Sequence, residues 1–232
     1  MRLFLPLFSI VLVLVSMSEN IFAQDFSNVG RYQNANTELS KIPNLGNRIV
    51  LIGDSITDFW SNADCNFFSD KPYLINRGIG GQTTTQILGR FDFDAIALKP
   101  KVIVILAGTN DIAGNTGPIS LPQIMENLSV MAAKAQTANI KVILCSVLPV
   151  FDYPWKPGII PSEKIIALNA LIKAYAQQNN IVYLDYFSAM VDTRNGLNAA
   201  YSGDGVHPNK KGYRVMEPLL EMAIIKSLKI NE

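Results

Sequence analysis

Residues 101–111, KVIVILAGTND, contain an uninterrupted apolar run that ends in glycine and polar residues. A run of this kind, rich in valine and isoleucine and bounded by turn residues, is typical of a strand buried on both faces of a parallel sheet. Four other stretches have the same form: residues 48–55 (RIVLIGDS), 73–81 (YLINRGIGG), 141–149 (KVILCSVLP) and 181–188 (IVYLDYFS). The sequence therefore predicts five strands.

Helical patterns lie between and after these runs. In residues 119–138 and 162–179, apolar residues recur every three or four positions, as on one face of a helix. A further helix is predicted for residues 208–229, with Pro208 near its first turn. Strands that alternate with helices indicate an α/β fold, a three-layer α/β/α sandwich around a five-stranded parallel sheet. Residues 151–161 interrupt the pattern and predict a surface loop, whose Tyr153 and Trp155 are expected to line a cleft.

Length and composition favour an ordered domain without a charged partner. The chain has 232 residues, of which 49% are hydrophobic and 17% charged, so it can bury a sizeable core. Its net charge is +1, which gives no electrostatic reason to expect binding to nucleic acid or to an anionic membrane.

The first residues resemble an export signal. Arg2 precedes an apolar run, and Ala23 is a small residue suited to cleavage before Gln24. We expect residues 1–23 to be a signal peptide, 24–47 an N-terminal extension and 48–232 the functional domain, and the mature protein to be secreted or periplasmic. A membrane anchor is the alternative, but the apolar run is shorter than the ~20 residues that span a bilayer.

Cysteine and histidine are too few for a zinc site. The chain has Cys65, Cys145 and a single histidine, His207. An exported protein can form a disulfide, but Cys145 lies in an apolar strand pattern and is equally compatible with a buried free thiol. The sequence leaves these two possibilities open.

Four distinctive stretches fall at the carboxyl ends of predicted strands or in the last loop, where parallel α/β sheets bind ligands. They are GDSIT (53–57), GIGGQTT (78–84), GTND (108–111) and DGVHP (204–208). The glycines of the second do not match the dinucleotide-binding pattern, because position 83 is threonine. The α/β-hydrolase pattern Gly-x-Ser-x-Gly does not occur in the chain.

Each stretch has a structural and a catalytic interpretation. Ser55 could cap a helix or act as a nucleophile, whereas Asp54 is expected to accept hydrogen bonds within its loop. Asn110 could belong to a turn or donate to an oxyanion. His207 could be a surface residue, or a general base oriented by the nearby Asp204. The common placement of the four stretches favours the catalytic interpretation.

Taken together, GDSI, NRGIGG, GTND and DGVHP resemble the GDSL, or SGNH, hydrolase family over residues 48–225. This resemblance implies a flavodoxin-like fold with Ser55 as nucleophile and His207 as base, oriented by Asp204. It also implies an oxyanion hole formed by the N–H groups of Ser55 and Gly81 and the side chain of Asn110, with Gly81 preferred to Gly80. Ile56 departs from the leucine of the family name, a change that should matter little.

The NRGIGGQTT stretch is most similar to the branch that contains platelet-activating-factor acetylhydrolases. Together with the predicted signal peptide, the resemblance implies an exported serine esterase that hydrolyses short, chiefly acetyl, esters of small molecules or carbohydrates, without a metal or organic cofactor. Two alternatives remain open: a lysophospholipase or thioesterase that acts on longer acyl chains, and a non-catalytic carbohydrate-binding relative. The oligomeric state does not follow from the sequence, and no stable membrane anchor is expected.

Overall fold

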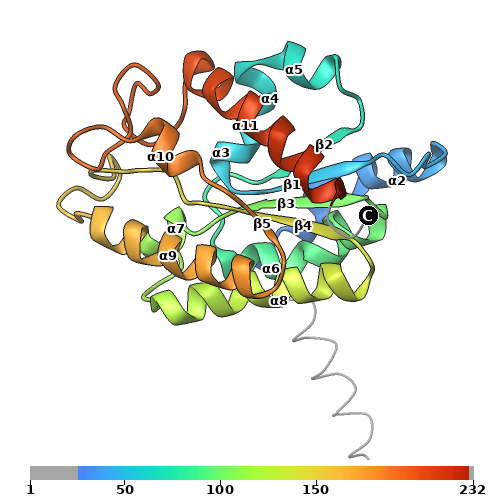
Figure 1. Ribbon diagram of the computed structural model, residues 1–232, viewed down its shortest axis with the longest axis horizontal. Helices are drawn as coiled ribbons and strands as arrows, with labels where there is room; N and C mark the ends of the chain where they lie inside the picture. The colour runs from blue at the N-terminus through green and yellow to red at the C-terminus, as the bar shows by residue number, and fades with distance from the viewer. Residues whose placement is uncertain (1–25, 230–232) are drawn as a thin grey trace, which may run out of the picture.

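A sheet of five parallel strands lies at the centre of the computed structural model, which describes residues 26–229 (Figure 1). The strands are β1 (Ile49–Gly53), β2 (Leu74–Gly78), β3 (Val102–Leu106), β4 (Lys141–Cys145) and β5 (Val182–Leu184). Their order across the sheet, β2-β1-β3-β4-β5, is that of flavodoxin-like folds. All five predicted strands are confirmed, and each is shorter than its apolar run because the last residues of the run turn away from the sheet.

Helices cover both faces of the sheet, which confirms the predicted α/β/α layers. The lower layer in Figure 1 contains α6 (Thr84–Asp94), α8 (Leu121–Thr137) and α9 (Ser162–Gln178). Alternate strand residues point to opposite layers. Val50 and Ile103 belong to the core between the sheet and the lower helices, whereas Leu51 and Val104 belong to the core on the opposite face. This burial on both faces explains why the strands are apolar throughout rather than alternating.

The upper layer contains α4 (Trp60–Ala63), α5 (Cys65–Ser69), α10 (Tyr186–Met190) and α11 (Lys210–Lys229). Trp60 is 2% exposed and stacks on Tyr213 of α11, with ring centroids 5.2 Å apart. The predicted last helix is confirmed, but it begins at Lys210, two residues after Pro208.

Short helices begin where strands end and fix the polar stretches there. α3 (Ser55–Asp58) follows β1, and α7 (Thr109–Ala113) follows β3. A further short helix, η2 (Ile96–Leu98), lies between α6 and β3. A Cβ atom at Gly78, the last residue of β2, would lie 2.7 Å from the Cα of Asp58. Only glycine therefore allows α3 to pack this closely on the end of β2.

The predicted N-terminal extension is folded against the domain from residue 26 onward. It contains η1 (Val29–Tyr32) and α2 (Gln33–Lys41), which pack on α6 and η2. Arg48 is buried and donates to the carbonyl oxygens of Leu39 and Ile42, at 2.8 and 2.7 Å, where α2 ends. The predicted signal peptide, residues 1–23, lies outside the described residues.

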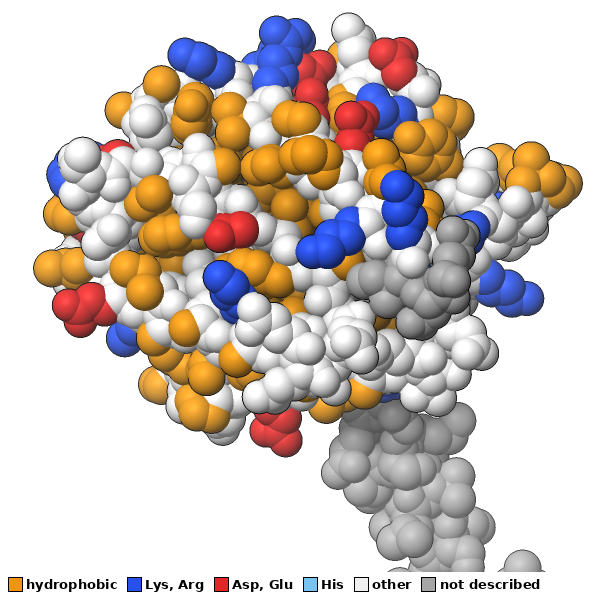
Figure 2. All heavy atoms as spheres, viewed as in Figure 1, with side chains coloured by type: hydrophobic (Ala, Val, Ile, Leu, Met, Phe, Trp, Pro, Cys, Tyr) orange, Lys and Arg blue, Asp and Glu red, His pale blue; other side chains and the backbone are white. Residues whose placement is uncertain are grey.

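The surface carries charges of both signs. On the face in Figure 2, acidic and basic side chains are both present and lie among hydrophobic ones. Across residues 26–229, no helix combines the length and apolarity that crossing a bilayer requires.

Cys65 is exposed on α5 and Cys145 is buried in β4, and both are free thiols. Burial raises the pKa of the Cys145 thiol, so this side chain stays neutral.

Candidate active site

Ser55 is the first residue of α3 and lies directly beyond the carboxyl end of β1. The N-cap of this helix is Asp54, whose Oδ1 accepts from the N–H of Ile56 at 3.0 Å, so the interpretation of Ser55 as the cap is wrong. The Ser55 side chain is therefore free for another partner. Its Oγ lies 2.9 Å from Nε2 of His207, although 152 positions separate the two residues in the chain.

His207 is oriented by the nearby carboxylate. Its Nδ1 lies 2.7 Å from Oδ2 of Asp204. Partial burial raises the pKa of Asp204, but hydrogen bonds from the His207 ring and from the N–H groups of His207 and Val206 outweigh it and lower the pKa to about 2. Asp204 is thus ionised at neutral pH and can only accept a hydrogen bond, so Nδ1 carries the proton and Nε2 presents a lone pair to Ser55.

The loop that carries this pair is held together by its own hydrogen bonds. Ser202 Oγ donates to the carbonyl of His207 at 2.8 Å and accepts from the N–H of Gly205 at 2.9 Å. Asp204 Oδ1 accepts from the N–H groups of Val206 and His207, at 2.9 and 2.8 Å. Ser202 was not predicted from the sequence, although its position two residues before Asp204 in a glycine-rich turn is a signal for such a role.

The glycine turn after β2 lies beside Ser55. A Cβ atom on Gly80 would be 3.8 Å from the Cβ of Ser55. The Gly80 N–H donates to Asp58 Oδ2 at 3.1 Å, whereas the Gly81 N–H has no acceptor in the part of the chain that the structure describes. Gly81 has a φ of 77°, a left-handed conformation that favours glycine. These contacts leave Gly81, rather than Gly80, with a free donor.

Asn110 is buried at the start of α7, and its orientation is fixed by hydrogen bonds. Its Oδ1 accepts from Asn115 Nδ2 at 2.9 Å, and its Nδ2 donates to the carbonyl of Gln82 at 3.0 Å. An amide nitrogen carries two hydrogens, so the second can serve a substrate oxygen. Asn115 also donates to the carbonyl of Gly81 at 3.2 Å and thereby connects the two candidate donors. Asn115 was not identified from the sequence, where only its distance of five positions from Asn110 hints at a common turn.

Two exposed aromatic rings lie close to the imidazole. The rings of Phe59 and Trp155 have centroids 5.2 and 6.2 Å from that of His207, and the two residues are 44% and 45% exposed. Phe59 was not identified from the sequence, although it stands four positions after Ser55 on the same helical segment, a spacing that places two residues on one face. Trp155 is supplied by the 151–161 loop, as predicted, and its Nε1 donates to Asn115 Oδ1 at 3.3 Å.

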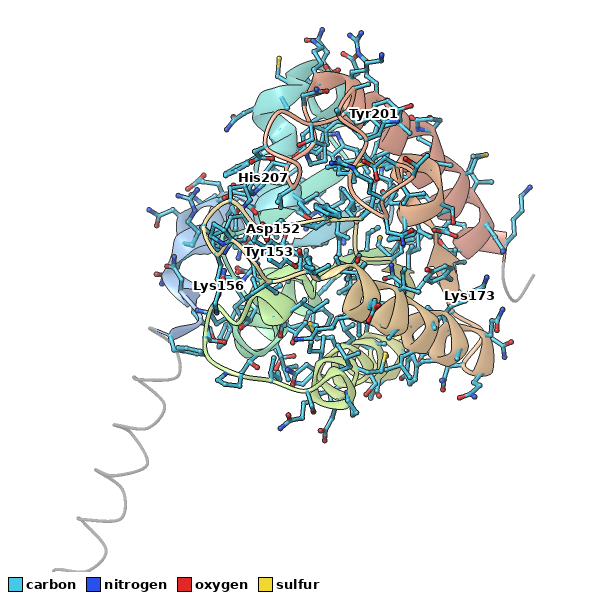
Figure 3. All side chains as sticks on the ribbon, turned by 90° about the vertical axis from the view of Figure 1, so that its left-hand side faces the viewer. Asp152, Tyr153, Lys156, Lys173, Tyr201 and His207 are labelled. Carbon is cyan, nitrogen blue, oxygen red and sulfur yellow. The ribbon has the colours of Figure 1, made fainter. Side chains whose placement is uncertain are left out.

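The prediction that Tyr153 lines a cleft is wrong. Tyr153 is fully buried, and its hydroxyl donates to the carbonyl of Thr109 at 2.9 Å, because a buried phenol requires a polar partner. Its ring lies against Trp155 at 5.0 Å between centroids. Lys156, on the same loop, donates to the carbonyl of Ala113 at 2.8 Å, at the end of α7. Figure 3 shows Asp152, Tyr153 and Lys156 of this loop beneath His207.

Buried carboxyl groups lie behind the site. Burial and then the charge of Asp111 raise the pKa of Asp54 to about 7, against the hydrogen bond from Ile56. Asp111 accepts from Thr84 N–H and Oγ1 and thereby joins α7 to the start of α6. Between residues 26 and 229, no three side chains among histidine, cysteine, aspartate and glutamate come together as metal ligands would.

The raised pKa of Asp54 predicts a dependence of stability on pH. Between about pH 4 and 7 the folded protein holds a proton at Asp54 that the unfolded chain releases, so the free energy of unfolding falls as pH rises through this range. Asp54→Asn keeps the acceptor for Ile56 and removes the charge. From pH 4 to pH 8 the variant is expected to gain up to about 4 kcal/mol relative to the unmodified protein, measured by urea unfolding.

Asp92→Asn is the control, because Asp92 is an exposed carboxylate paired with Lys134 at 2.7 Å. Both substitutions replace a carboxyl group with an amide, so a change in the pH slope seen for Asp54→Asn alone comes from the burial of that group. Equal slopes for Asp54→Asn and the unmodified protein would contradict the raised pKa.

Known proteins match the chain over most of its length. The model of the GDSL-like lipase/acylhydrolase family matches residues 51–215. A solved structure of a GDSL-like lipase from Bacteroides thetaiotaomicron is 42% identical with a TM-score of 0.83, and the match covers 87% of this chain and 98% of that one.

Two enzymes are more distant relatives. An acetylxylan esterase of Xylanibacter ruminicola is 27% identical over 216 residues, which cover 76% of this chain but 43% of that protein. The chain thus spans less than half the length of this esterase. The human platelet-activating factor acetylhydrolase IB subunit alpha2 is 25% identical over 75% of each chain. The fold, the order of the four polar stretches and the length of the family match lead to one conclusion: the chain belongs to the GDSL-like lipase/acylhydrolase family.

Proposed function

We propose that the protein is a serine esterase that forms an acyl-enzyme on Ser55. The observation that carries the proposal is the continuous hydrogen-bonded chain from Ser55 Oγ through the His207 ring to Asp204, with distances of 2.9 and 2.7 Å. A serine hydroxyl becomes a strong nucleophile only when a base takes its proton, and a carboxylate stabilises the imidazolium that results.

The first half-reaction uses each group once. Ser55 Oγ attacks the ester carbonyl while its proton moves to Nε2 of His207. The negative oxygen of the tetrahedral intermediate accepts hydrogen bonds from the N–H groups of Ser55 and Gly81 and from Asn110 Nδ2. Each such donor is worth about 3 kcal/mol of transition-state stabilisation. When the C–O bond breaks, the leaving alkoxide takes the proton from His207 and departs as the alcohol.

The second half-reaction frees the serine. A water molecule gives a proton to His207 Nε2 and attacks the acyl carbon, and the same donors hold the oxyanion. The bond to Ser55 then breaks, its oxygen recovers the proton from His207, and the carboxylic acid leaves. All steps are acid–base and acyl-transfer chemistry of this chain's own side chains.

We further propose a short acyl group, chiefly acetyl, on a carbohydrate alcohol. The exposed rings of Phe59 and Trp155, both close to His207, offer flat apolar surfaces to the leaving alcohol, as a sugar ring requires. Two relatives, named for acetylxylan and for the acetyl group of platelet-activating factor, support this choice. In this proposal residues 1–23 direct export, and the enzyme acts outside the cytoplasm.

A series of p-nitrophenyl esters tests the acyl preference. Acetate is expected to be hydrolysed at least about tenfold faster, in kcat/KM, than octanoate, because each misfit methylene group costs about 1–3 kcal/mol in a site shaped for a smaller group. Initial rates at a fixed pH, from acetate through butyrate to laurate, measure this directly.

The same series separates the alternatives. Faster hydrolysis of octanoate or laurate than of acetate would favour a lysophospholipase or thioesterase, and lysophospholipids and acyl-thioesters would then be assayed. Absence of any ester hydrolysis by the pure protein, together with retention on an acetylated xylan column, would favour a non-catalytic carbohydrate-binding role.

A further inference from the structure

The turn that carries Gly81, residues 78–82, is fixed from two sides. On the inner side, Asp58 accepts from the Gly80 N–H, and Asn110 donates to the carbonyl of Gln82. On the outer side, both partners belong to the N-terminal extension: the Tyr32 hydroxyl donates to the carbonyl of Gly78, and the Gln82 side chain donates to the carbonyl of Ser27 at 2.8 Å.

Tyr32 is held firmly enough to position its partner. Its ring lies under the guanidinium of Arg77, whose carbon is 4.7 Å from the ring centroid. Arg77 Nε donates to Asn36 Oδ1 at 2.8 Å, and Asn36 Nδ2 donates to Asp94 at 2.8 Å. Burial raises the pKa of Tyr32, and nearby Asp58 adds to this, so the hydroxyl keeps the proton it donates to Gly78.

Gln82 connects the extension to the strand that precedes the nucleophile. It is 4% exposed, and its Oε1 accepts from Arg90 Nε at 2.6 Å. Arg90 is fully buried, donates to the carbonyl of Gly53 at 3.0 Å and pairs with Asp94 at 3.1 Å. One network therefore joins Ser27, the Gly81 turn and the end of β1, two residues before Ser55.

Ser27 of the extension packs closely against α6. Ser27 is 2% exposed. A Cβ atom on Gly89 of α6 would collide with Ser27 Oγ and lie 3.0 Å from Ser27 Cβ. The absence of a side chain at position 89 thus sets how closely Ser27 approaches, and with it the place of the carbonyl that Gln82 reaches.

We propose that residues 26–41 are a positioning element of the oxyanion hole, in which Tyr32 and the carbonyl of Ser27 hold the Gly81 turn at the distance the transition state requires. The inference rests on the proposed esterase function. Oxyanion donors act through preorganised geometry, and a displacement of about 1 Å can cost 10²-fold in rate. Loosening the turn therefore lowers kcat and leaves KM nearly unchanged, because the donors bind the transition state more strongly than the substrate.

Tyr32→Phe removes the hydroxyl and keeps the ring over Arg77. Its kcat for p-nitrophenyl acetate is expected to fall about tenfold with KM within about twofold, and the rate of inactivation by a phosphonate ester, which places an anionic oxygen in the same hole, should fall in parallel. Tyr175→Phe is the matched control. Tyr175 lies in α9, away from the Gly81 turn, and its half-buried phenol also donates to a backbone carbonyl, that of Ser129, at 3.3 Å. The control should keep the unmodified rates.

A second variant separates positioning from stability. Gly89→Ala touches no group of the site and raises the helix propensity of α6, but its Cβ atom would collide with Ser27 Oγ and displaces Ser27 from α6. We expect a lower kcat, by about fivefold to tenfold, without a fall in the urea midpoint. Ser27→Gly added to Gly89→Ala removes the colliding atoms, keeps the carbonyl of residue 27 and should restore the rate.

The outcomes are distinct. If the unmodified protein hydrolyses no ester, the proposed function is wrong and the inference is overturned with it. If the unmodified protein is active and both Tyr32→Phe and Gly89→Ala match Tyr175→Phe in kcat and in phosphonate inactivation, the esterase stands and the positioning role is overturned. Loss of rate that follows loss of stability, with no rescue by Ser27→Gly, also overturns it.

Discussion

Ser55→Ala is expected to lower kcat for p-nitrophenyl acetate by at least about 10⁴-fold, close to the limit of detection. In the proposed mechanism the hydroxyl removed is the atom that forms the acyl-enzyme. Within the described residues, no other hydroxyl is hydrogen-bonded to the imidazole of His207, the single histidine of the chain. The fold should persist, since the cap of α3 is Asp54 and does not involve the Ser55 side chain. Steady-state kinetics and far-UV circular dichroism of the purified variant measure the two effects.

Ser188→Ala is a matched control for this loss. Ser188 also lies in a short helix that follows a strand, and its Oγ donates to Asp185 at 2.8 Å. It makes no hydrogen bond to His207. The control should retain full activity. A Ser55→Ala protein that keeps more than about a tenth of the rate would show that another nucleophile carries the reaction.

Asp204→Asn is expected to lower kcat by about 10³- to 10⁴-fold while the loop keeps its shape. Oδ1 can still accept from the N–H groups of Val206 and His207, so the backbone hydrogen bonds survive. The amide that replaces Oδ2 is a donor and faces Nδ1 of His207. The ring proton must then move to Nε2, the nitrogen that has to take the proton of Ser55, and the imidazole is held in the unproductive tautomer.

Asp192→Asn provides the comparison at a second loop. Asp192 Oδ1 accepts from the N–H groups of Arg194 and Gly196, at 2.8 Å in both cases, so the substitution there changes a turn of the same kind away from the imidazole. Little change in kcat is expected. Nearly full activity of Asp204→Asn alongside an inactive Ser55→Ala would mean that some other group sets the tautomer of His207.

The strands and the two long helices of the lower layer were predictable because burial imposes a regular pattern on them. β3 is buried at all five positions, and α8 and α9 each place one apolar stripe on the sheet. α6 was not predicted, since its inward face includes the buried pair Arg90 and Asp94, which breaks the apolar spacing. α2 has no fully buried residue and contains just two apolar residues, Ala35 and Leu39, too few to mark a helix by repeated apolar spacing.

The candidate catalytic residues were predictable for a different reason. Ser55, Asn110 and His207 belong to short polar stretches at the ends of strands or in the last loop, and the topology of a parallel sheet places such stretches together. Tyr32 and Gln82 could not be found in this way. Their hydrogen bonds join positions 46 and 55 residues apart, and nothing in the local spacing of either residue indicates the partner.

The loop at residues 202–208 is held by hydrogen bonds among its own residues. The two parts of the site therefore differ in how strongly substitutions elsewhere in the protein can disturb them. His207 and Asp204 lie three residues apart in this loop, so their mutual arrangement is set locally. It survives small movements of the helices relative to the sheet. The distance from Ser55 to His207 is set differently. It depends on how α3 and α11 pack in the upper layer, where the Tyr213 hydroxyl donates to the carbonyl of Ile56 at 2.8 Å. Substitutions in the core between the sheet and the upper helices would therefore change the distance from Ser55 Oγ to His207 Nε2 first. They would leave the hydrogen bond between His207 and Asp204 intact.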